Sequence, residues 1–491
     1  MDRKLYERID RWMEAHRDAI IQDICRLVRI PSVSEPGGAD APFGQGCRDA
    51  LEEMLRLGAE YGFHTHNYEN HVGALWLEDG PMDNTIGFWN HLDVVPAGGN
   101  WAYPSFEPVV KQSWLIGRGA QDNKGPAVGM LYVMRCLKEL GVPLKHRLCL
   151  FVGCDEERGM EDLEYYTAHY ETPALSMIAD SGFPVCYGEK GIIEGNMTAK
   201  RPLSFDVEDI RGGTVSNMIP DLAQATLRGE TARRAMKVLG SEETSPHAVC
   251  AEETDGVQIR TNGGGSVTVT VRGTARHSAF PEGSVNAIQK LLALLAEKGV
   301  WSDADEAVLR GFQEANSDYY GEALGIAFED AVSGKLTCAG TVASMNEGIL
   351  TLHFNIRYSI TETQEHILEG LQAFCETHQC AFQLLRGSGP SYFNRSHPAV
   401  DLLTSLYNAV MGTEAEPFVM GGGTYARKLP NAFAYGIGGM PKTEEQKECT
   451  LFASQHGDAH QPDEGLYLPS FMKALKIYAL AVTELKQLER L

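Results

Sequence analysis

The sequence predicts an α/β fold in which a domain with a mostly parallel sheet is interrupted by an inserted α+β domain. From Leu5 to about Gly188, apolar runs typical of buried strands alternate with amphipathic helical patterns. Strands separated by helices need crossover connections, which parallel sheets have. From about Ile192 to Gln383, short alternating segments and long helices replace this pattern, which resumes after Pro398. The expected domains are residues 1–190, 191–397 and 398–491, of which the first and last form one unit.

The first part of the α/β domain is expected to hold three helices and three buried strands. The strands are apolar runs bounded by turn residues, and the helices have apolar positions at helical spacing. The helices are expected at about Leu5–Arg29, Asp49–Tyr61 and Gly125–Leu140, and the strands within Gly87–Asp93, Cys149–Glu157 and Leu175–Asp180.

The same patterns place elements in the inserted domain and the returning segment. In the insertion we expect strands at Ala223–Arg228, Ser266–Arg272 and Ile349–Tyr358, and helices at Ser284–Lys298 and Thr363–Thr377. Residues Leu203–Ile210 and Gly263–Gly265 look like loops or turns. In the returning segment we expect helices at Val400–Met411 and Leu466–Leu488 and strands at Pro417–Met420 and Ala432–Ile437.

Charge and cysteine usage limit the class of partner and the compartment. Aspartate and glutamate outnumber lysine and arginine by 66 to 43, which gives a formal net charge of -23 and disfavours nucleic acid and anionic membranes as partners. The 11 cysteines are scattered without a C-x-x-C pair, as expected for reduced thiols. Neither a signal segment nor 18 uninterrupted apolar residues occurs in the sequence. We therefore expect a cytoplasmic protein with no nucleic-acid and no membrane partner.

Each of the three apolar runs stops on an acidic or histidine cluster. His91 and Asp93 end the first, Asp155–Glu157 follow the second, and Asp180 ends the third. Ligands bind at the carboxyl edge of open α/β sheets, and carboxylates crowded there repel one another unless a cation lies between them. A solvated surface run fits Asp155–Glu157 less well, because Leu148–Val152 before them are nearly all apolar. The strand ends therefore predict a metal site.

Two further segments can complete such a site. Asp122 lies in the glycine-rich Gly117–Gly125 just before a helix, where it fits either a ligand or an N-cap. His456 and His460 are either solvated loop residues or ligands, if the C-terminal segment returns to the same sheet edge. Carboxylate and imidazole ligands suit Zn, Mn or Co. Two metal ions would explain why so many carboxylates meet.

Six ordered sequence blocks resemble the M20 metallopeptidases. Three blocks resemble the signature of the family: Asn90–Pro96, Gly117–Gly125 and Asp155–Glu157. Three more resemble its PepV-type dipeptidases: Gly188–Gly191, Gly421–Arg427 and His460–Glu464. That group includes carnosine-hydrolysing and D-residue-tolerant members. The blocks span nearly the whole chain. The resemblance implies a zinc-peptidase-like catalytic domain with the inserted α+β domain as its lid. Asn90, Asn123 and Ile178–Gly182 depart from the family pattern.

The resemblance also implies a role for each residue of the metal site. His91 and Asp180 would bind one metal ion, Glu157 and His460 the second, and Asp122 would bridge both. Zinc is the expected metal, with manganese or cobalt as alternatives. Glu156 would be the general base, and Asp93 would orient His91. His460 is preferred to His456 because its Gln-Pro-Asp-Glu context matches. The bond after the bridging aspartate is a cis peptide in the family, here Asp122–Asn123.

Residues of the lid and of the glycine-rich block would contact the substrate in the resembling enzymes. His277 matches the lid histidine that stabilises the oxyanion. Asn217 and Arg357 match positions that line the cleft, although a strand-end ion pair is an alternative for Arg357. Backbone amides of the Gly421–Thr424 segment, which includes Gly422, Gly423 and Thr424, would help hold the substrate carboxylate.

The expected activity is hydrolysis of a dipeptide, a small peptide substrate, through a water that bridges the two metal ions. An N-acyl amino acid deacylase is the alternative, because the same chemistry cleaves either amide. A non-catalytic metal-binding protein would lack a ligand or the base, and none is missing. The insertion is about twice as long as the lid of dimeric relatives, so the resemblance implies a monomer whose lid imitates a dimer.

Overall fold

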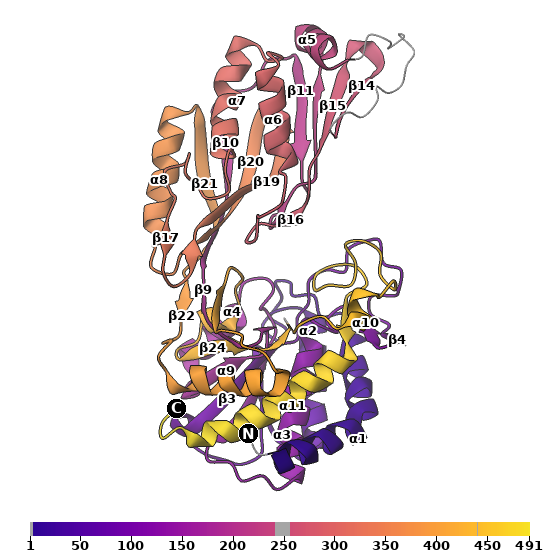
Figure 1. The fold of residues 1–491 in the computed structure, drawn as a ribbon, viewed down its shortest axis with the longest axis vertical. Coiled ribbons are helices and arrows are strands. Elements are labelled where there is room, and N and C mark those ends of the chain that lie inside the picture. Colours follow the sequence, from indigo (N-terminus) through magenta and orange to yellow (C-terminus); the bar gives the residue numbers. More distant parts are fainter. Residues whose placement is uncertain (1–2, 241–255, 439) are drawn as a thin grey trace. The chain divides into compact units, whose positions relative to one another are not determined.

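The computed structural model describes residues 3–240, 256–438 and 440–491, which fall into two compact units (Figure 1). Unit 1 consists of the N-terminal residues through Gly188, with Tyr392–Val419 and Gly423–Leu491. Unit 2 consists of Glu189–Ser391 and Met420–Gly422. The α/β class with an inserted α+β unit is confirmed. Within the described ranges, the helices are all too short or too polar to cross a membrane.

Unit 1 is built on a nine-stranded sheet whose centre is parallel. The strands follow the order β1-β2-β6-β3-β7-β24-β9-β22, with β23 beside β9. Their bounds are β1 His64–Tyr68, β2 Val72–Trp76, β3 Thr85–His91, β6 Arg147–Gly153, β7 Leu175–Ile178, β9 Val185–Glu189, β22 Ser391–Tyr392, β23 Phe418–Met420 and β24 Ala432–Tyr435. β6, β3, β7 and β24 run parallel, whereas β1, β2 and β9 pair antiparallel towards the edges. The predicted parallel sheet is therefore its central part.

Helices cover both faces of this sheet. The helices of unit 1 are α1 Arg3–Val28, α2 Gln45–Glu60, α3 Lys124–Glu139, α4 Glu161–His169, α9 Pro398–Met411, α10 Glu444–Lys447 and α11 Leu468–Glu484. Consecutive strand residues point to opposite faces, so Phe88 and Trp89 of β3 mark the two layers. The ring of Phe88 lies 6.3 Å from that of Tyr478 in α11, and the ring of Trp89 lies 5.3 Å from that of Tyr166 in α4.

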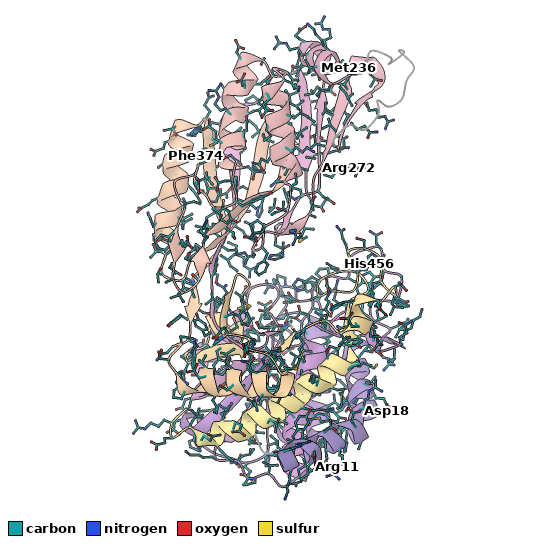
Figure 2. The ribbon with its side chains drawn as sticks, viewed as in Figure 1. Arg11, Asp18, Met236, Arg272, Phe374 and His456 are labelled. Atoms are coloured by element: carbon teal, nitrogen blue, oxygen red, sulfur yellow. The ribbon has the colours of Figure 1, made fainter. Side chains whose placement is uncertain are left out.

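Helix α1 packs on the same side of the sheet as α3 and α11. Ile9, Met13 and Ile20 are completely buried, because helical spacing puts them on one stripe facing α3 and α11. Arg11 and Asp18 project from the opposite, exposed side (Figure 2). The N-terminal helix is therefore part of the core.

Unit 2 has an eight-stranded sheet with the order β14-β15-β13-β11-β19-β20-β10-β21 and its own apolar core. The strands are β10 Gly191–Ala199, β11 Val207–Gly212, β13 Leu222–Leu227, β14 Val257–Thr261, β15 Val267–Arg272, β19 Thr337–Asn346, β20 Ile349–Tyr358 and β21 Cys380–Ser388. The helices are α5 Gly229–Leu239, α6 Ala287–Glu297, α7 Asp303–Ala315 and α8 Gln364–Thr377. A two-stranded ribbon pairs β12, Met218–Ile219, with β16, Arg276–His277.

The prediction of a loop at Leu203–Ile210 is wrong for the second half of this segment. Val207–Gly212 form β11, which pairs with β13 and is irregular between Val207 and Asp209. This irregularity breaks the period of two, so Val207 and Ile210 are both buried although they are three residues apart. Alternation alone could not reveal the strand.

Candidate metal centre

The ends of three parallel strands meet at one sheet edge. His91 at the end of β3 is in register with Gly153 at the end of β6, and Trp89 is in register with Ile178 at the end of β7. Because the strands end within two residues of one another, the polar residues that follow share this edge. The strand-end argument from the sequence therefore has its structural basis.

The turn after β6 is held by two buried carboxylates. Asp93 accepts hydrogen bonds from the backbone N–H groups of Glu156 (3.1 Å) and Glu157 (2.9 Å). Asp162 of α4 accepts from those of Cys154 (2.6 Å) and Asp155 (3.0 Å), and from the hydroxyl of Tyr425. The backbone that carries Glu156 and Glu157 is thereby fixed from both sides.

The loop that carries Asp122 is organised by Glu464. One oxygen of this carboxylate accepts from the backbone N–H groups of Gly119, Gln121 and Asp122 at 3.0, 2.9 and 3.1 Å. The other accepts from Nη1 of Arg118 at 2.6 Å, and both side chains are buried. The peptide bond between Asp122 and Asn123 is cis, as the resemblance implied.

A small sheet brings the C-terminal segment back to this loop. β26, Gly465–Tyr467, pairs with β5, Trp114–Ile116, and the N–H of Gly117 donates to the carbonyl of Glu464. His460 lies a few residues before β26. The pairing of three residues on each strand therefore brings His460 back to the loop that carries Asp122, although the two are far apart in the sequence.

Two groups of three side chains each present ligand atoms close enough to hold a metal ion. In the first, His91 Nε2 lies 3.0 Å from Asp122 Oδ1 and 3.7 Å from Asp180 Oδ2. In the second, His460 Nε2 lies 3.0 Å from Asp122 Oδ2 and 3.0 Å from Glu157 Oε1. Asp122 thus turns one oxygen to each group. His91 Nδ1 lies 3.0 Å from the backbone oxygen of Asp93, which leaves Nε2 directed at the carboxylates.

The other late histidine lies elsewhere. His456 Nδ1 is 2.6 Å from Asp463, whose other oxygen accepts from the N–H groups of Ala102 and Tyr103. His456 belongs to neither group of possible ligands. The choice of His460 over its rival agrees with this geometry.

The charges of the cluster are those of a site for cations. Burial and the nearby charge of Asp122 raise the pKa of Asp180 to about 7, and the same two causes raise the pKa of Glu157. Burial alone would lower the pKa of His460, but hydrogen bonds to Asp122 and Glu157 raise it to about 11. Without a metal ion, the carboxylates and the histidine share the available protons. Divalent cations would neutralise the carboxylates instead.

Three observations indicate that the residues fit two metal ions. The ligand set is imidazole and carboxylate, which zinc, manganese and cobalt accept. Two ligand atoms bound tetrahedrally to zinc are about 3.4 Å apart, close to the distances of 3.0 to 3.7 Å seen within the groups. Finally, Glu156 Oε1 is buried and has no hydrogen-bond partner in the described part of the chain.

Comparison with known proteins identifies the family of the chain. The sequence model of peptidase family M20/M25/M40 matches residues 87–484. The chain belongs to this family.

Relatives of this M20 peptidase match nearly its whole length. It is 29% identical over 481 residues to a protein of Bacillus subtilis (strain 168) named "Putative dipeptidase YtjP", with 96% of this chain and 97% of that protein covered. Among solved structures, the dipeptidase Dug1p from Saccharomyces cerevisiae has a TM-score of 0.56 at 14% identity and 99% coverage of both chains. Human carnosine dipeptidase 1 has a TM-score of 0.54 at 15% identity, with 98% of this chain and 100% of that chain covered. These two structures share the fold.

The predicted substrate-binding residues of unit 2 are joined by hydrogen bonds. The N–H of Ser278 donates to the carbonyl of Asn217 (2.9 Å), next to His277 in the paired ribbon. Asn355 Oδ1 accepts from the hydroxyl of Ser278 (2.9 Å) and from Nε of Arg357 (3.0 Å). A Cβ placed on Gly421 would lie only 2.8 Å from that of Ala279. The M20 peptidase thus gathers His277, Asn217 and Arg357 in one part of unit 2.

The glycine-rich block continues into unit 1. A Cβ on Gly423 would lie 2.3 Å from Nε of Arg427, so the guanidinium group of Arg427 packs closely against Gly423. Thr424 caps the short helix that follows, because its hydroxyl accepts from the N–H of Ala426 at 3.2 Å. Gly422 lies in unit 2 beside Met420. The block therefore ends in a capped helical turn that begins after Thr424.

The residues that support the ligands were missed by sequence reasoning. Glu464 was part of a matching block but received no role, and Asp162 and Arg118 were not singled out. The signal for Asn123 was present, because Asn90 and Asn123 both depart from the family pattern. In the structure, Nδ2 of Asn90 donates to Oδ1 of Asn123, whose Nδ2 donates to Asp180 Oδ1 (3.1 Å).

We expect the substitution Glu464→Gln to destabilise unit 1 strongly. Glutamine keeps the shape but presents an NH2 group where a carboxylate oxygen now accepts, so Arg118 or the backbone donors lose their partner. Breaking a buried ion pair costs about 3–5 kcal/mol. Chemical denaturation and thermal unfolding measure this loss.

The matched control is Glu445→Gln. Glu445 also accepts two hydrogen bonds, from Ser113 and Tyr467, but it is exposed. Its replacement should cost clearly less stability. Equal losses in the two variants would contradict the role given to Glu464.

Proposed function

We propose that this chain is a dipeptidase that uses two divalent metal ions, with zinc as the first choice and manganese or cobalt as alternatives. The observation that carries the proposal is the position of Asp122 between two groups of possible ligands, with the unpartnered carboxyl oxygen of Glu156 nearby. The similarity to a relative named as a dipeptidase supports a dipeptide as the substrate.

The two ligand groups divide the work of metal binding. His91, Asp122 and Asp180 would hold one ion, and Asp122, Glu157 and His460 the other. Such ions polarise a carbonyl group and lower the pKa of a water molecule. Asp93 fixes this arrangement, because it contacts His91 and receives the N–H groups of Glu156 and Glu157.

Glu156 acts as the general base. Its carboxyl group is nearly buried, and burial, with the charges of Asp180 and Glu157 also contributing, raises its pKa well above the ordinary value. A carboxylate with a raised pKa is a better base. Glu156 accepts a proton from the attacking water through Oε1 and returns it to the nitrogen of the leaving amine.

Unit 2 and the glycine-rich block that continues into unit 1 supply the groups that bind the substrate. The N–H of Ala279 donates to Nδ1 of His277 at 3.1 Å, which places the proton of a neutral ring on Nε2. His277 is then a donor for the oxyanion. Arg357, held by Asn355, binds the substrate carboxylate together with Asn217 and the backbone of Gly422, Gly423 and Thr424.

We expect Glu156→Gln to lower kcat by about 10²- to 10⁴-fold, the usual contribution of a positioned acid–base group. The variant should retain its metal ions, because Glu156 belongs to neither ligand group. Initial rates and elemental analysis of the purified protein measure the two effects. Glu161→Gln, at an exposed position on α4, is the control. Near-normal turnover in Glu156→Gln would disprove the assignment.

A panel of substrates decides between dipeptidase and N-acyl amino acid deacylase. We expect the metal-reconstituted protein to cleave Ala-Ala or carnosine and to leave N-acetyl and N-succinyl amino acids intact. The ground for this expectation is the similarity to a relative named as a dipeptidase. Release of amino acids is measured by chromatography. Preferential cleavage of the acylated amino acids would favour the deacylase.

We also propose that the protein is a monomer, because unit 2 contains a continuous eight-stranded sheet with its own core. Light scattering should give a mass near that of one chain, 53.9 kDa. Twice this mass would contradict the proposal.

A further inference from the structure

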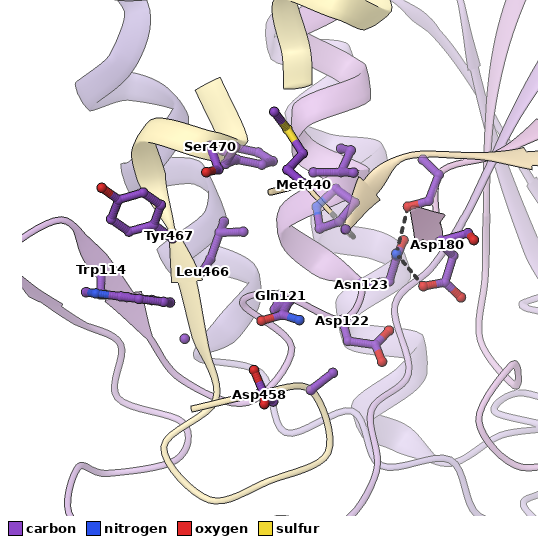
Figure 3. Close-up of a pocket in the computed structure, with 18 of the residues that line it drawn as sticks. Trp114, Gln121, Asp122, Asn123, Asp180, Met440, Asp458, Leu466, Tyr467 and Ser470 are labelled. Atoms are coloured by element: carbon purple, nitrogen blue, oxygen red, sulfur yellow. Dashed lines mark hydrogen bonds between the residues drawn. The ribbon is translucent and has the colours of Figure 1, made fainter. Parts of the chain in front are cut away.

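A cavity of about 410 Å³ lies in unit 1 beside the candidate metal centre (Figure 3). Asp122 and Asp180 form one end of its wall, so the cavity borders the ligand groups directly. Trp114 and Tyr467 lie at the other end (Figure 3). Small-molecule pockets range from about 300 to 1,000 Å³. The cavity is therefore large enough to receive a substrate side chain.

The outer wall of the cavity is built from fixed elements. The ring of Trp114 packs against the rings of Phe452 and Tyr467, with centroids 5.0 Å away in each case. Glu445 of α10 accepts from Ser113 at 2.6 Å and from the hydroxyl of Tyr467 at 2.7 Å. These contacts tie α10 to β5 and β26, so the shape of the wall is set before a ligand arrives.

Apolar side chains form the larger part of the wall, which Gln121, Asn123 and Ser181 also line. Ile437, Leu466 and Phe471 are buried behind it, and they present carbon atoms to the cavity. Lys442 and Asp458 are exposed at its rim and carry opposite charges, so these two residues do not favour a substrate side chain of either charge. An apolar side chain gains most from such an environment, because its burial releases it from water.

We propose that this cavity receives the side chain of the amino-terminal residue of a dipeptide and selects for leucine-like or larger apolar side chains. This inference rests on the proposed function. The residues assigned there to the substrate carboxylate do not line the cavity, as far as the described residues go. The cavity therefore serves the other end of the substrate, next to the ligand groups.

Ser470 offers a way to fill the cavity without touching the metal ligands. It lies in the first turn of α11, is half-buried and lines the cavity. Ser470→Leu should lower kcat/KM for Leu-Ala at least about tenfold relative to Ala-Ala, since one methylene in an apolar pocket changes specificity by this much or more. The ratio of Ala-Leu to Ala-Ala should not change.

Two further variants and two physical readouts accompany this test. Ser405→Leu makes the same exchange at an exposed position of α9 that does not line the cavity, and should leave all ratios unchanged. Met440→Trp fills the cavity from another part of its wall and should repeat the loss for Leu-Ala. Thermal unfolding and elemental analysis establish that each variant is folded and retains its metal ions.

The possible results separate this inference from the proposed function. A wild-type protein that cleaves none of the dipeptides overturns both. Normal cleavage with unchanged Leu-Ala ratios in folded Ser470→Leu and Met440→Trp overturns the role of the cavity alone. A selective loss for Ala-Leu overturns the assignment to the amino-terminal residue, and a wild-type preference for Lys-Ala over Leu-Ala overturns the apolar selection.

Discussion

The carboxylate of Glu464 is the contact on which the candidate site depends most. It accepts hydrogen bonds from the backbone N–H groups of three residues of the Asp122 loop and pairs with the buried Arg118. Asp122 can turn its two oxygens to different histidines only if the backbone behind it is fixed. His460 is linked to the same carboxylate, because Arg118 Nη2 also donates to the carbonyl of His460 at 3.4 Å. One buried ion pair thus positions ligands that lie far apart in the sequence.

The acids around the site have two different functions. Asp93, Asp162 and Glu464 accept backbone N–H groups and hold loops, whereas Asp122, Glu157 and Asp180 turn towards histidines. The N–H donors fix where these carboxylates lie, although burial still raises the pKa of Asp162 and of Glu464 to about 7. Within the described residues, Asp122, Glu157 and Asp180 accept no backbone N–H group and lie against histidines instead, which suits them to a cation. The local hydrogen bonds therefore sort acids that look equivalent in the sequence.

Sequence patterns could predict the elements that obey a regular period and the ligands that stand at strand ends. The runs that end near His91, Glu157 and Asp180 are continuous, apolar and bounded by turns, so β3, β6 and β7 were recognised. Strand β11 was missed because its irregular pairing with β13 interrupts the alternation. Glu464 and Asp162 were missed for another reason: their partners are backbone N–H groups, which leave no trace in the identity of the partner residue. Their roles could be seen only in three dimensions.

The pair of amides at Asn90 and Asn123 has a consequence for how this site can change. Asn123 donates to Asp180 and to the carbonyl of Ala179 while it accepts from Asn90. An aspartate at position 123 would lose both donations and would place a second negative charge against Asp180. Residues 90, 123 and 180 are therefore expected to vary together among related sequences. A chain that exchanges one of them is expected to carry a compensating exchange at another.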